Sequence, residues 1–267
     1  MKRFFISALA LLGMDTMANA HFSVVNDGKV IFVLAEGTPD YITFENVLPC
    51  VGVIGEAVDM GLSVKWSSVN IGASSPEQSG DYIAWGETEA KEYYDWSTYK
   101  YMQSGKSKWN YINKYQANDH QLDSSWYMDV KYYQGDKKTT LEAKDDVATQ
   151  SWGSEWRIPT AAEWEELYNN TTQTWTYDYE GTGVNGYILT STKEGHEGAS
   201  IFLPAAGRRD GRGLYSEGND GYYWSSSLNE ENSSYGRDLE FEEYNSTRDA
   251  SIRCYGQSVR PVCPSAE

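Results

Sequence analysis

The 267-residue chain has few of the residues that most often carry covalent or metal chemistry, with only three histidines and three cysteines. The histidines are His21, His120 and His196, and no Ser or Cys motif beside them would complete a catalytic triad. The cysteines form no Cys-x-x-Cys pair and have no neighbouring histidine, as a zinc site would require. We therefore expect no catalytic residues, no metal site and no cofactor, and we expect that the protein is not an enzyme.

Basic residues are also scarce, with 22 Lys and Arg against 39 Asp and Glu and a formal net charge of -17. A surface that binds nucleic acid has to be basic because it neutralises phosphates. Anionic membranes likewise attract basic rather than acidic segments. The charge therefore argues against nucleic acid and anionic membranes as partners, and it is typical of a well-solvated exported protein.

The apolar run at the N-terminus, residues 4–14, is too short to cross a bilayer as a helix. Lys2 and Arg3 precede it, and Ala18-Asn19-Ala20 fits a cleavage site. We expect a signal peptide over residues 1–20 that is cleaved after Ala20. The mature protein would be secreted, periplasmic or at the cell surface, without membrane insertion.

In an oxidising compartment, three cysteines allow one disulfide and leave one free thiol. A bond between Cys254 and Cys263 would close a short loop, whereas a bond between Cys50 and Cys263 would join the start of the main domain to its end. The residues alone leave both pairings open.

Aromatic residues and glycine are abundant, with 10 Trp, 21 Tyr and 24 Gly, which is typical of short strands joined by many loops. Asn26-Asp27-Gly28 lies between two apolar-rich runs and predicts a hairpin. Residues 40–44 could add a third strand. Residues 21–56 are therefore expected to form a small β module with its connector.

The main domain is expected over residues 57–264, and its first strand is predicted at residues 62–66 by their alternating pattern. Residues 86–140 lack periodicity and predict long ordered loops, held by Trp96, Trp109 and Trp126. Short strands are predicted at residues 186–191, 200–207, 222–227, 238–241 and 257–262.

Two helices are predicted between the loops and the later strands. The first covers residues 141–151. The second begins at Thr160, whose side chain would form a capping box with Glu163. Trp164, Leu167 and Tyr168 fall on one helical face and predict a core contact. Helices and strands that are segregated along the chain predict an α+β fold.

Several stretches, taken in order, resemble a known family. They are VDMGLSVKW (58–66), GDYIAWGET (80–88), WGSEWRIPTAAEWEEL (152–167), IFLPAAGRR (201–209), YYWSSS (222–227) and GQSVRPVC (256–263). This set resembles the Fibrobacter succinogenes major paralogous domain, a branch of the C-type-lectin-like fold that is related to the formylglycine-generating enzyme fold. The resemblance covers about residues 57–264 and implies a bacterial, C-type-lectin-like protein.

The resemblance implies that the first and last strands of the domain pair, with LSVKW beside QSVRPV. Cys50 would then lie near Cys263, which makes Cys50–Cys263 the preferred disulfide candidate. The chain lacks the Glu-Pro-Asn, Gln-Pro-Asp and Trp-Asn-Asp motifs of calcium-dependent lectins, and its cysteines do not match the pair of the formylglycine-generating enzyme. A structural calcium ion stays open, without support from the acidic pairs 145–146 and 242–243.

Proteins with this ending include targets of diversity-generating retroelements, in which substitutable positions lie on an invariant frame. The resemblance implies a frame of Trp224, Ser225, Leu239, Phe241, Gly256, Val259 and Arg260. The ligand-binding positions between them would be Asn229, Glu231, Asn232, Tyr235, Tyr244, Ser246, Arg248, Asp249, Ser251, Arg253 and Tyr255. Paratopes use these residue types; the alternative is an ordinary loop rich in turn formers.

A neighbouring stretch adds further ligand-binding candidates, namely Arg208, Arg209, Arg212, Tyr215 and Tyr222. Three arginines this close in an acidic chain could bind an acidic ligand through paired hydrogen bonds. They could equally pair with carboxylates of the protein itself.

The function expected from the sequence is exported, non-catalytic binding of a protein or glycan ligand, as in an adhesin or receptor. One alternative is a divergent enzyme of the formylglycine-generating or carbohydrate-active type, because carboxylates are abundant and a catalytic pair stays open. Another is a structural component of a surface assembly, docked through the N-terminal module.

Overall fold

The computed structural model describes residues 22–26, 29–34, 54–117 and 135–265, and the chain divides into two compact units, Met1–Val47 and Leu48–Glu267. In the first unit, β1 (Phe22–Asn26) and β2 (Lys29–Leu34) form an antiparallel hairpin. The hairpin predicted around Asn26-Asp27-Gly28 is therefore confirmed. The expected signal peptide, the third strand at 40–44 and Cys50 lie outside the described residues.

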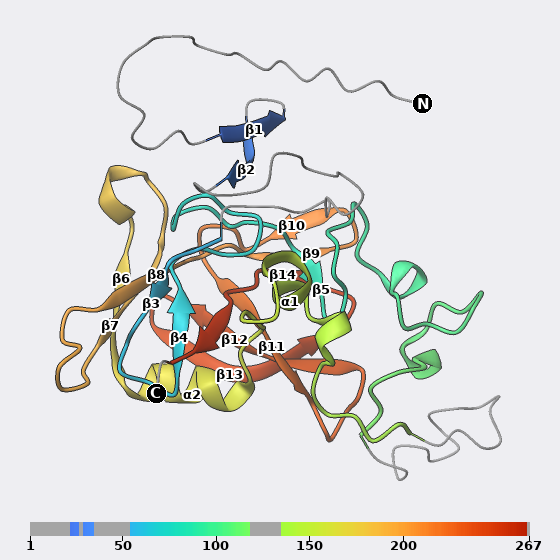
Figure 1. The fold of residues 1–267 in the computed structure, drawn as a ribbon. Helices are drawn as coiled ribbons and strands as arrows, with labels where there is room; N and C mark the ends of the chain where they lie inside the picture. The colour runs from blue at the N-terminus through green and yellow to red at the C-terminus, as the bar shows by residue number, and fades with distance from the viewer. Residues whose placement is uncertain (1–21, 27–28, 35–53, 118–134, 266–267) are drawn as a thin grey trace. The chain divides into compact units, whose positions relative to one another are not determined.

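The described residues of the second unit form mainly short antiparallel strands, with two α-helices (Figure 1). Its strands are β3 (Ala57–Val58), β4 (Val64–Ser67), β5 (Ile83–Ala84), β6 (Thr171–Thr176), β7 (Gly186–Ser191), β8 (Ser200–Pro204), β9 (Arg208–Asp210), β10 (Gly213–Tyr215), β11 (Gly221–Leu228), β12 (Tyr235–Glu242), β13 (Asn245–Ile252), β14 (Gly256–Gln257) and β15 (Val262–Pro264). Its helices are α1 (Val147–Trp152) and α2 (Ala161–Asn169), with short 3-10 turns η2 (Trp96–Thr98), η3 (Trp109–Tyr111), η5 (Ala143–Asp145) and η6 (Tyr179–Gly181). This content of mostly antiparallel sheet with few helices is compatible with the predicted α+β class and also with a mostly-β class. Among the described residues, no helix is long and apolar enough to cross a membrane.

The strands of this unit for which the structure gives positions form four sheets, in the orders β15-β4-β3, β6-β7-β8, β11-β12-β13 and β10-β9-β14-β5. The first sheet joins the two ends of the domain, because Val262 pairs with Trp66 and Cys263 with Lys65. The implied pairing of first and last strands is thus present, but the last strand begins at Val262 instead of residue 257. Gly256 and Gln257 belong to another sheet, so the chain changes sheets between β14 and β15.

Helix α2 begins as its sequence predicts. The Thr160 side chain accepts a hydrogen bond from the Glu163 backbone N–H, and the Glu163 carboxylate accepts one from the Thr160 N–H at 2.7 Å. Trp164 and Leu167 are buried, while Tyr168 is only half-buried. Helix α1 is shorter than the predicted 141–151, because η5 comes first and Asp146 then caps α1.

The predicted frame residues all lie in the interior. Each of Trp224, Ser225, Leu239, Phe241, Val259 and Arg260 is at most 3% exposed, and Gly256 is buried as well. Arg260 has no carboxylate partner among the described residues; its guanidinium donates to the Asn70 side chain and to the carbonyls of Ser67 and Phe202. Burial lowers the pKa of Arg260 to about 10. These side chains hold several strands together.

The long ordered loop that follows β5 is held by tyrosines as well as by the predicted Trp96, which packs against the core and meets the Tyr99 ring edge-on at 5.4 Å. Trp109 is 40% exposed, and Trp126 lies outside the described residues. The hydroxyl of Tyr99 donates to the Trp85 carbonyl at 2.7 Å, and the hydroxyl of Tyr101 donates to the Gly86 carbonyl at 2.6 Å. A tyrosine ring fills apolar space while its hydroxyl satisfies a loop carbonyl, and this combination suits a loop packed on a core.

Candidate recognition surface

The structure gathers four of the predicted ligand-binding residues around β9. The Arg208 guanidinium carbon lies 4.8 Å from the centre of the Tyr222 ring and 5.1 Å from that of Tyr255. Tyr235 pairs with Ile252, whose carbonyl accepts a hydrogen bond from the Tyr255 backbone N–H at 3.0 Å. These residues come from β9, β11, the start of β12 and the turn before β14, so the fold brings together segments that are separate in the sequence.

The Arg208 guanidinium is half-buried and holds its position through stacking alone. Among the described residues no carboxylate lies within ion-pair distance of it, and no acceptor takes its N–H groups. Stacking of a guanidinium on tyrosine is favourable but leaves those donors in the ring plane unused. Arg208 is therefore available to an acceptor from outside.

Tyr222 contributes its ring, because only 5% of the residue is exposed. Its hydroxyl donates to the Asp220 carboxylate at 3.2 Å and also lies beside Glu240, its cross-strand partner. Burial, followed by the charge of Glu240, raises the pKa of Tyr222. The prediction that Tyr222 contacts a ligand directly is corrected to a supporting role beneath Arg208.

Arg209, the next residue of β9, lies over a different tyrosine. Its guanidinium carbon is 5.0 Å from the Tyr82 ring centre, and no acceptor or carboxylate among the described residues binds it. Arg212 approaches Glu92 at 4.0 Å and lies over Tyr93 at 5.8 Å. The sequence left two interpretations of the three arginines: binding of an acidic ligand, or pairing with carboxylates of the protein itself. Among the described residues, Arg212 alone of the three pairs with a carboxylate, and that contact is long and exposed to solvent. Tyr215 is 55% exposed at the end of β10.

Strand β13 forms one edge of its sheet, since β12 is its partner and β11 lies on the far side of β12. Asp249 is exposed on this strand, whereas Ser251 is buried, and Arg248 lies opposite Leu239 in the register. Ser246 is half-buried, with a side-chain oxygen that has no partner among the described residues. The burial of Ser251 corrects its assignment to a ligand-binding surface.

Asn229 and Asn232 shape the connection between β11 and β12. The Asn229 side-chain oxygen accepts from the backbone N–H groups of Glu231 and Asn232, at 3.0 and 3.2 Å. The Asn232 oxygen accepts from the Ser234 backbone at 3.0 Å and from its hydroxyl at 2.7 Å. These oxygens serve turn geometry, while the Glu231 side chain is exposed and available.

Arg253 is not part of the surface, and its prediction as a ligand-binding residue is wrong. It is fully buried, 4.6 Å above Trp85, and donates to the Tyr99 hydroxyl. Its terminal nitrogens donate to the carbonyls of Tyr115, Ser233 and Lys114 at 2.8–3.1 Å. A buried guanidinium that satisfies three carbonyls of two distant loops holds the fold together.

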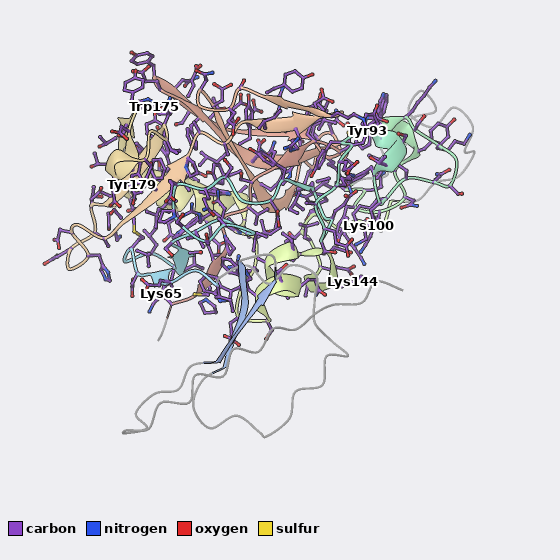
Figure 2. All side chains as sticks on the ribbon, turned by 90° about the horizontal axis from the view of Figure 1, so that it is seen from above. Lys65, Tyr93, Lys100, Lys144, Trp175 and Tyr179 are labelled. Atoms are coloured by element: carbon purple, nitrogen blue, oxygen red, sulfur yellow. The ribbon has the colours of Figure 1, made fainter. Side chains whose placement is uncertain are left out.

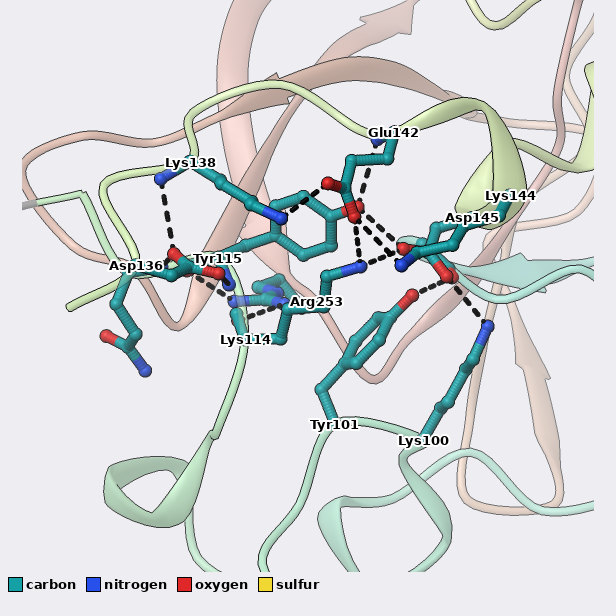
Figure 3. A network of polar contacts seen from close by, with 12 residues as sticks. Lys100, Tyr101, Lys114, Tyr115, Asp136, Lys138, Glu142, Lys144, Asp145 and Arg253 are labelled. Atoms are coloured by element: carbon teal, nitrogen blue, oxygen red, sulfur yellow. Dashed lines mark hydrogen bonds and ion pairs between the residues drawn. The ribbon is translucent and has the colours of Figure 1, made fainter.

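Beside Arg253 lies a network of charges that the sequence did not reveal (Figure 3). The buried Asp145 carboxylate binds the ammonium groups of Lys100 and Lys114, and it accepts from the Tyr115 hydroxyl. Burial opposes ionisation of Asp145, but these hydrogen bonds prevail and hold its pKa well below the usual range. Lys114 also binds Glu142 at 2.6 Å, and hydrogen bonds from Lys114 and Lys138 lower the pKa of Glu142 to about 2. The network closes the long loop onto η5.

Tyr244 belongs to a second aromatic area, at the turn between β12 and β13. It is 87% exposed, and Tyr177 nearby is 60% exposed. A hydrogen bond with Glu243 raises the pKa of Tyr177 to about 12. Trp175 packs edge-on against Tyr177 and lies near one end of the second unit in Figure 2, whereas Tyr93 lies near the other. The predicted residues therefore occupy two areas rather than one patch.

The structure describes two of the three cysteines. Cys254 is buried and Cys263 half-buried, and they are not joined to each other. Burial raises the pKa of the Cys254 thiol to about 12. The preferred Cys50–Cys263 pairing involves a residue outside the described part of the chain and stays a prediction.

Comparisons of the chain with protein-family models, with curated proteins and with solved structures gave no match.

Proposed function

We propose that this protein is an exported, non-catalytic binding protein of the C-type-lectin-like type, acting as an adhesin or receptor for a ligand outside the cell. The observation that carries the proposal is the position of Arg208, half-buried between Tyr222 and Tyr255 with its N–H donors unused by the described residues. Arginine and tyrosine are the residues that most often dominate the energy of a binding interface.

The arrangement around Arg208 is preorganised for recognition. A guanidinium that is removed from water without an acceptor carries a desolvation cost, and a ligand that supplies the acceptor relieves it. Since two rings already fix the side chain, little rotamer freedom is lost on binding. A carboxylate or a pair of carbonyl or hydroxyl oxygens would fit its fork of donors.

Three features support the C-type-lectin-like assignment and its family resemblance. The first and last strands pair through Val262 and Trp66, the two helices lie between the loops and the later strands, and the frame implied by the resemblance is buried. We further propose that exposed positions between the frame residues, such as Asp249 and Glu231, are the substitutable ones. Substitution there would leave the core unchanged.

The size of the surface favours a macromolecular ligand. Tyr235 pairs with Ile252 at one end of the β12–β13 ladder, and Tyr244 lies beyond Glu242 at the other end. Strands rise about 3.4 Å per residue, so the two ends are roughly 24 Å apart. A ligand that contacts both aromatic areas would be a protein or a glycan chain.

The test uses the full chain on an array of plant polysaccharides, bacterial surface polysaccharides and extracellular-matrix glycoproteins. We expect Arg208→Gln to weaken binding to the spots that the wild type recognises by at least tenfold. Arg237→Gln, which changes a half-buried arginine of β12, is the matched control and should bind as the wild type does. Wild-type protein that binds no spot, or equal binding by Arg208→Gln, would overturn the proposal.

A further inference from the structure

A second feature of the hairpin β9–β10 is an open depression of about 600 Å³ on the side of Arg209. Its lining comes from the segment before β5, the loop after β5 and the hairpin itself, and includes Tyr82, Lys91, Glu92, Tyr94, Arg209 and Arg212. Its volume falls within the range of small-molecule sites. Unlike most such sites, it is lined chiefly by polar and charged groups, which favours a polar ligand.

Arg209 is fixed in the wall of this depression by a rigid support. Its guanidinium stacks on Tyr82, whose hydroxyl donates to the Ala206 carbonyl at 2.6 Å. The Tyr94 hydroxyl in turn donates to the Tyr82 carbonyl, and Tyr94 pairs with Gly211 through two backbone hydrogen bonds of 2.8 Å. The half-buried guanidinium has no hydrogen-bond acceptor among the described residues, so its donors are free for a carboxylate.

Two further cations border the same space. Lys91 is held by Glu87 at 2.9 Å and by the Thr98 carbonyl at 3.2 Å, which leaves the third N–H of its ammonium group for another acceptor. The side chain of Arg212 is 76% exposed and that of Glu92 is 93% exposed, and they approach only to 4.0 Å. A contact this long in solvent contributes little, so Arg212 can turn toward an anion at small cost.

The lining carries both signs of charge, which discriminates between anionic ligands. A small inorganic anion would meet Glu92 as a repelling neighbour. A sugar acid differs, because it has one carboxylate and several hydroxyls that both donate and accept. Its carboxylate matches Arg209 and Arg212, and its hydroxyls match Lys91 and Glu92.

We propose that this depression binds a uronic acid residue of an acidic polysaccharide, with the Arg209 guanidinium holding the sugar carboxylate through two hydrogen bonds. Arg212 closes over the same carboxylate from the turn between β9 and β10. This inference rests on the proposed binding function and names a class of ligand for it.

The test is isothermal titration calorimetry of the full chain with a galacturonic acid trisaccharide, and with the galactose trisaccharide of the same linkage as the neutral probe. We expect the wild type to bind the acid at least tenfold more tightly than the neutral sugar, and to lose affinity as NaCl rises. Arg209→Gln should lower affinity for the acid at least tenfold. Equal binding of the two sugars, or no effect of Arg209→Gln, would overturn the inference.

Two variants and a peptide complete the design. Arg212→Gln changes an exposed side chain and should lower the affinity for the acidic trisaccharide severalfold without lowering the melting temperature. This variant controls for the case in which Arg209→Gln weakens binding by disturbing the Tyr82 support. Arg237→Gln changes a half-buried arginine of β12 that does not line the depression, and it should bind the trisaccharide normally. If a glutamate tripeptide binds as tightly as the sugar acid, the ligand class is wrong. Array binding that depends on Arg208 without trisaccharide binding would remove this inference and leave the proposed function intact.

Discussion

Arg208 and Arg209 are consecutive residues of β9, yet their guanidiniums stack on tyrosines of different segments, Tyr222 and Tyr255 for the first and Tyr82 for the second. Successive side chains of a strand point to opposite faces of its sheet. One short strand therefore presents two arginines to two separate surfaces. A substitution at one arginine leaves the tyrosine support of the other in place.

Substitution of Arg253 is expected to destabilise the fold. Arg253→Met would leave the carbonyls of Lys114, Tyr115 and Ser233 without their donor in the interior. A buried group left without a hydrogen bond costs about 1–3 kcal/mol, so we expect a loss of at least about 3 kcal/mol in the free energy of unfolding. Urea denaturation measures it, with the exposed Arg212→Met as the control. A loss below about 1 kcal/mol would indicate that Arg253 is exposed at the surface and not buried.

Asp238 is expected to make the protein more stable at acid pH. Burial raises its pKa to about 7, above the value of 3.8 in the unfolded chain. The folded state therefore holds the proton more tightly, and the stability it confers is complete below pH 4 and is lost as the pH rises through 7. Gln257 donates to one Asp238 oxygen at 2.8 Å, while the other oxygen and the Gln257 carbonyl lack partners among the described residues, so a proton between them would complete the pairing.

The measurement is the unfolding free energy of Asp238→Asn between pH 4 and 8. Wild type should lose on the order of 4 kcal/mol more than the variant across this range. Asp249→Asn, the exposed residue opposite Asp238 in the ladder, should follow the wild type. Parallel curves for wild type and Asp238→Asn would show that Asp238 is ionised in the folded state.

Asp145 is expected to have the opposite effect. Its pKa is lowered by hydrogen bonds from Lys114, Tyr115, Tyr101 and Lys100 that outweigh burial, so its contribution is present above pH 4 and is lost as the pH falls below that value. Asp145→Asn should cost about 3 kcal/mol at pH 7, because two lysines lose their common partner. Thermal unfolding at pH 7 and pH 2.5 tests this, and the prediction fails if the cost is the same at both.

Local signals in the sequence predicted part of this fold correctly. The capping box of Thr160 and Glu163 needs only four consecutive residues. The residue pattern that predicts the strand at 186–191 likewise lies entirely within those six residues. Strand β13 was missed because Asn245–Ile252 is polar on both faces, and it becomes a strand through its ladder with β12. Pairing with the next strand likewise explains β6, whose six residues all pair with β7.

The candidate site was predictable in its segment but not in the role of each residue. Arg253 and Asp249 look alike in a polar stretch, yet one is fully buried and the other exposed. The difference arises because Arg253 lies beyond the end of β13, where the loop carrying Lys114 and Tyr115 covers it. Residues so distant in the sequence give no local signal of that contact, and the acid network around Asp145 was missed for the same reason.

The proposed diversification predicts a pattern of natural variation. Across many isolates, substitutions at the gene's 3′ end should concentrate at adenine-bearing codons of exposed positions such as Glu231, Tyr244 and Asp249. Trp224 and Arg253 should stay constant, since both are buried. DNA sequencing of this segment and its flank, with a search for a near-copy repeat and a reverse transcriptase gene, checks it. If Arg253 varies as freely as Asp249, the assignment of Asp249 to the binding surface and of Arg253 to the interior is wrong.

The central claim is that Tyr235 and Tyr244, at the two ends of the β12–β13 ladder, and Tyr255, in the turn before β14, bind a ligand and do not hold the fold. Its most direct test is the triple variant Tyr235→Ala, Tyr244→Ala, Tyr255→Ala of the full chain on the polysaccharide and glycoprotein array, with a melting curve of the same sample. We predict that binding to the wild-type spots is lost while the melting temperature stays within about 4 °C, the shift that 1 kcal/mol produces in a domain of this size. Binding that survives, or a fold that collapses, would contradict the account.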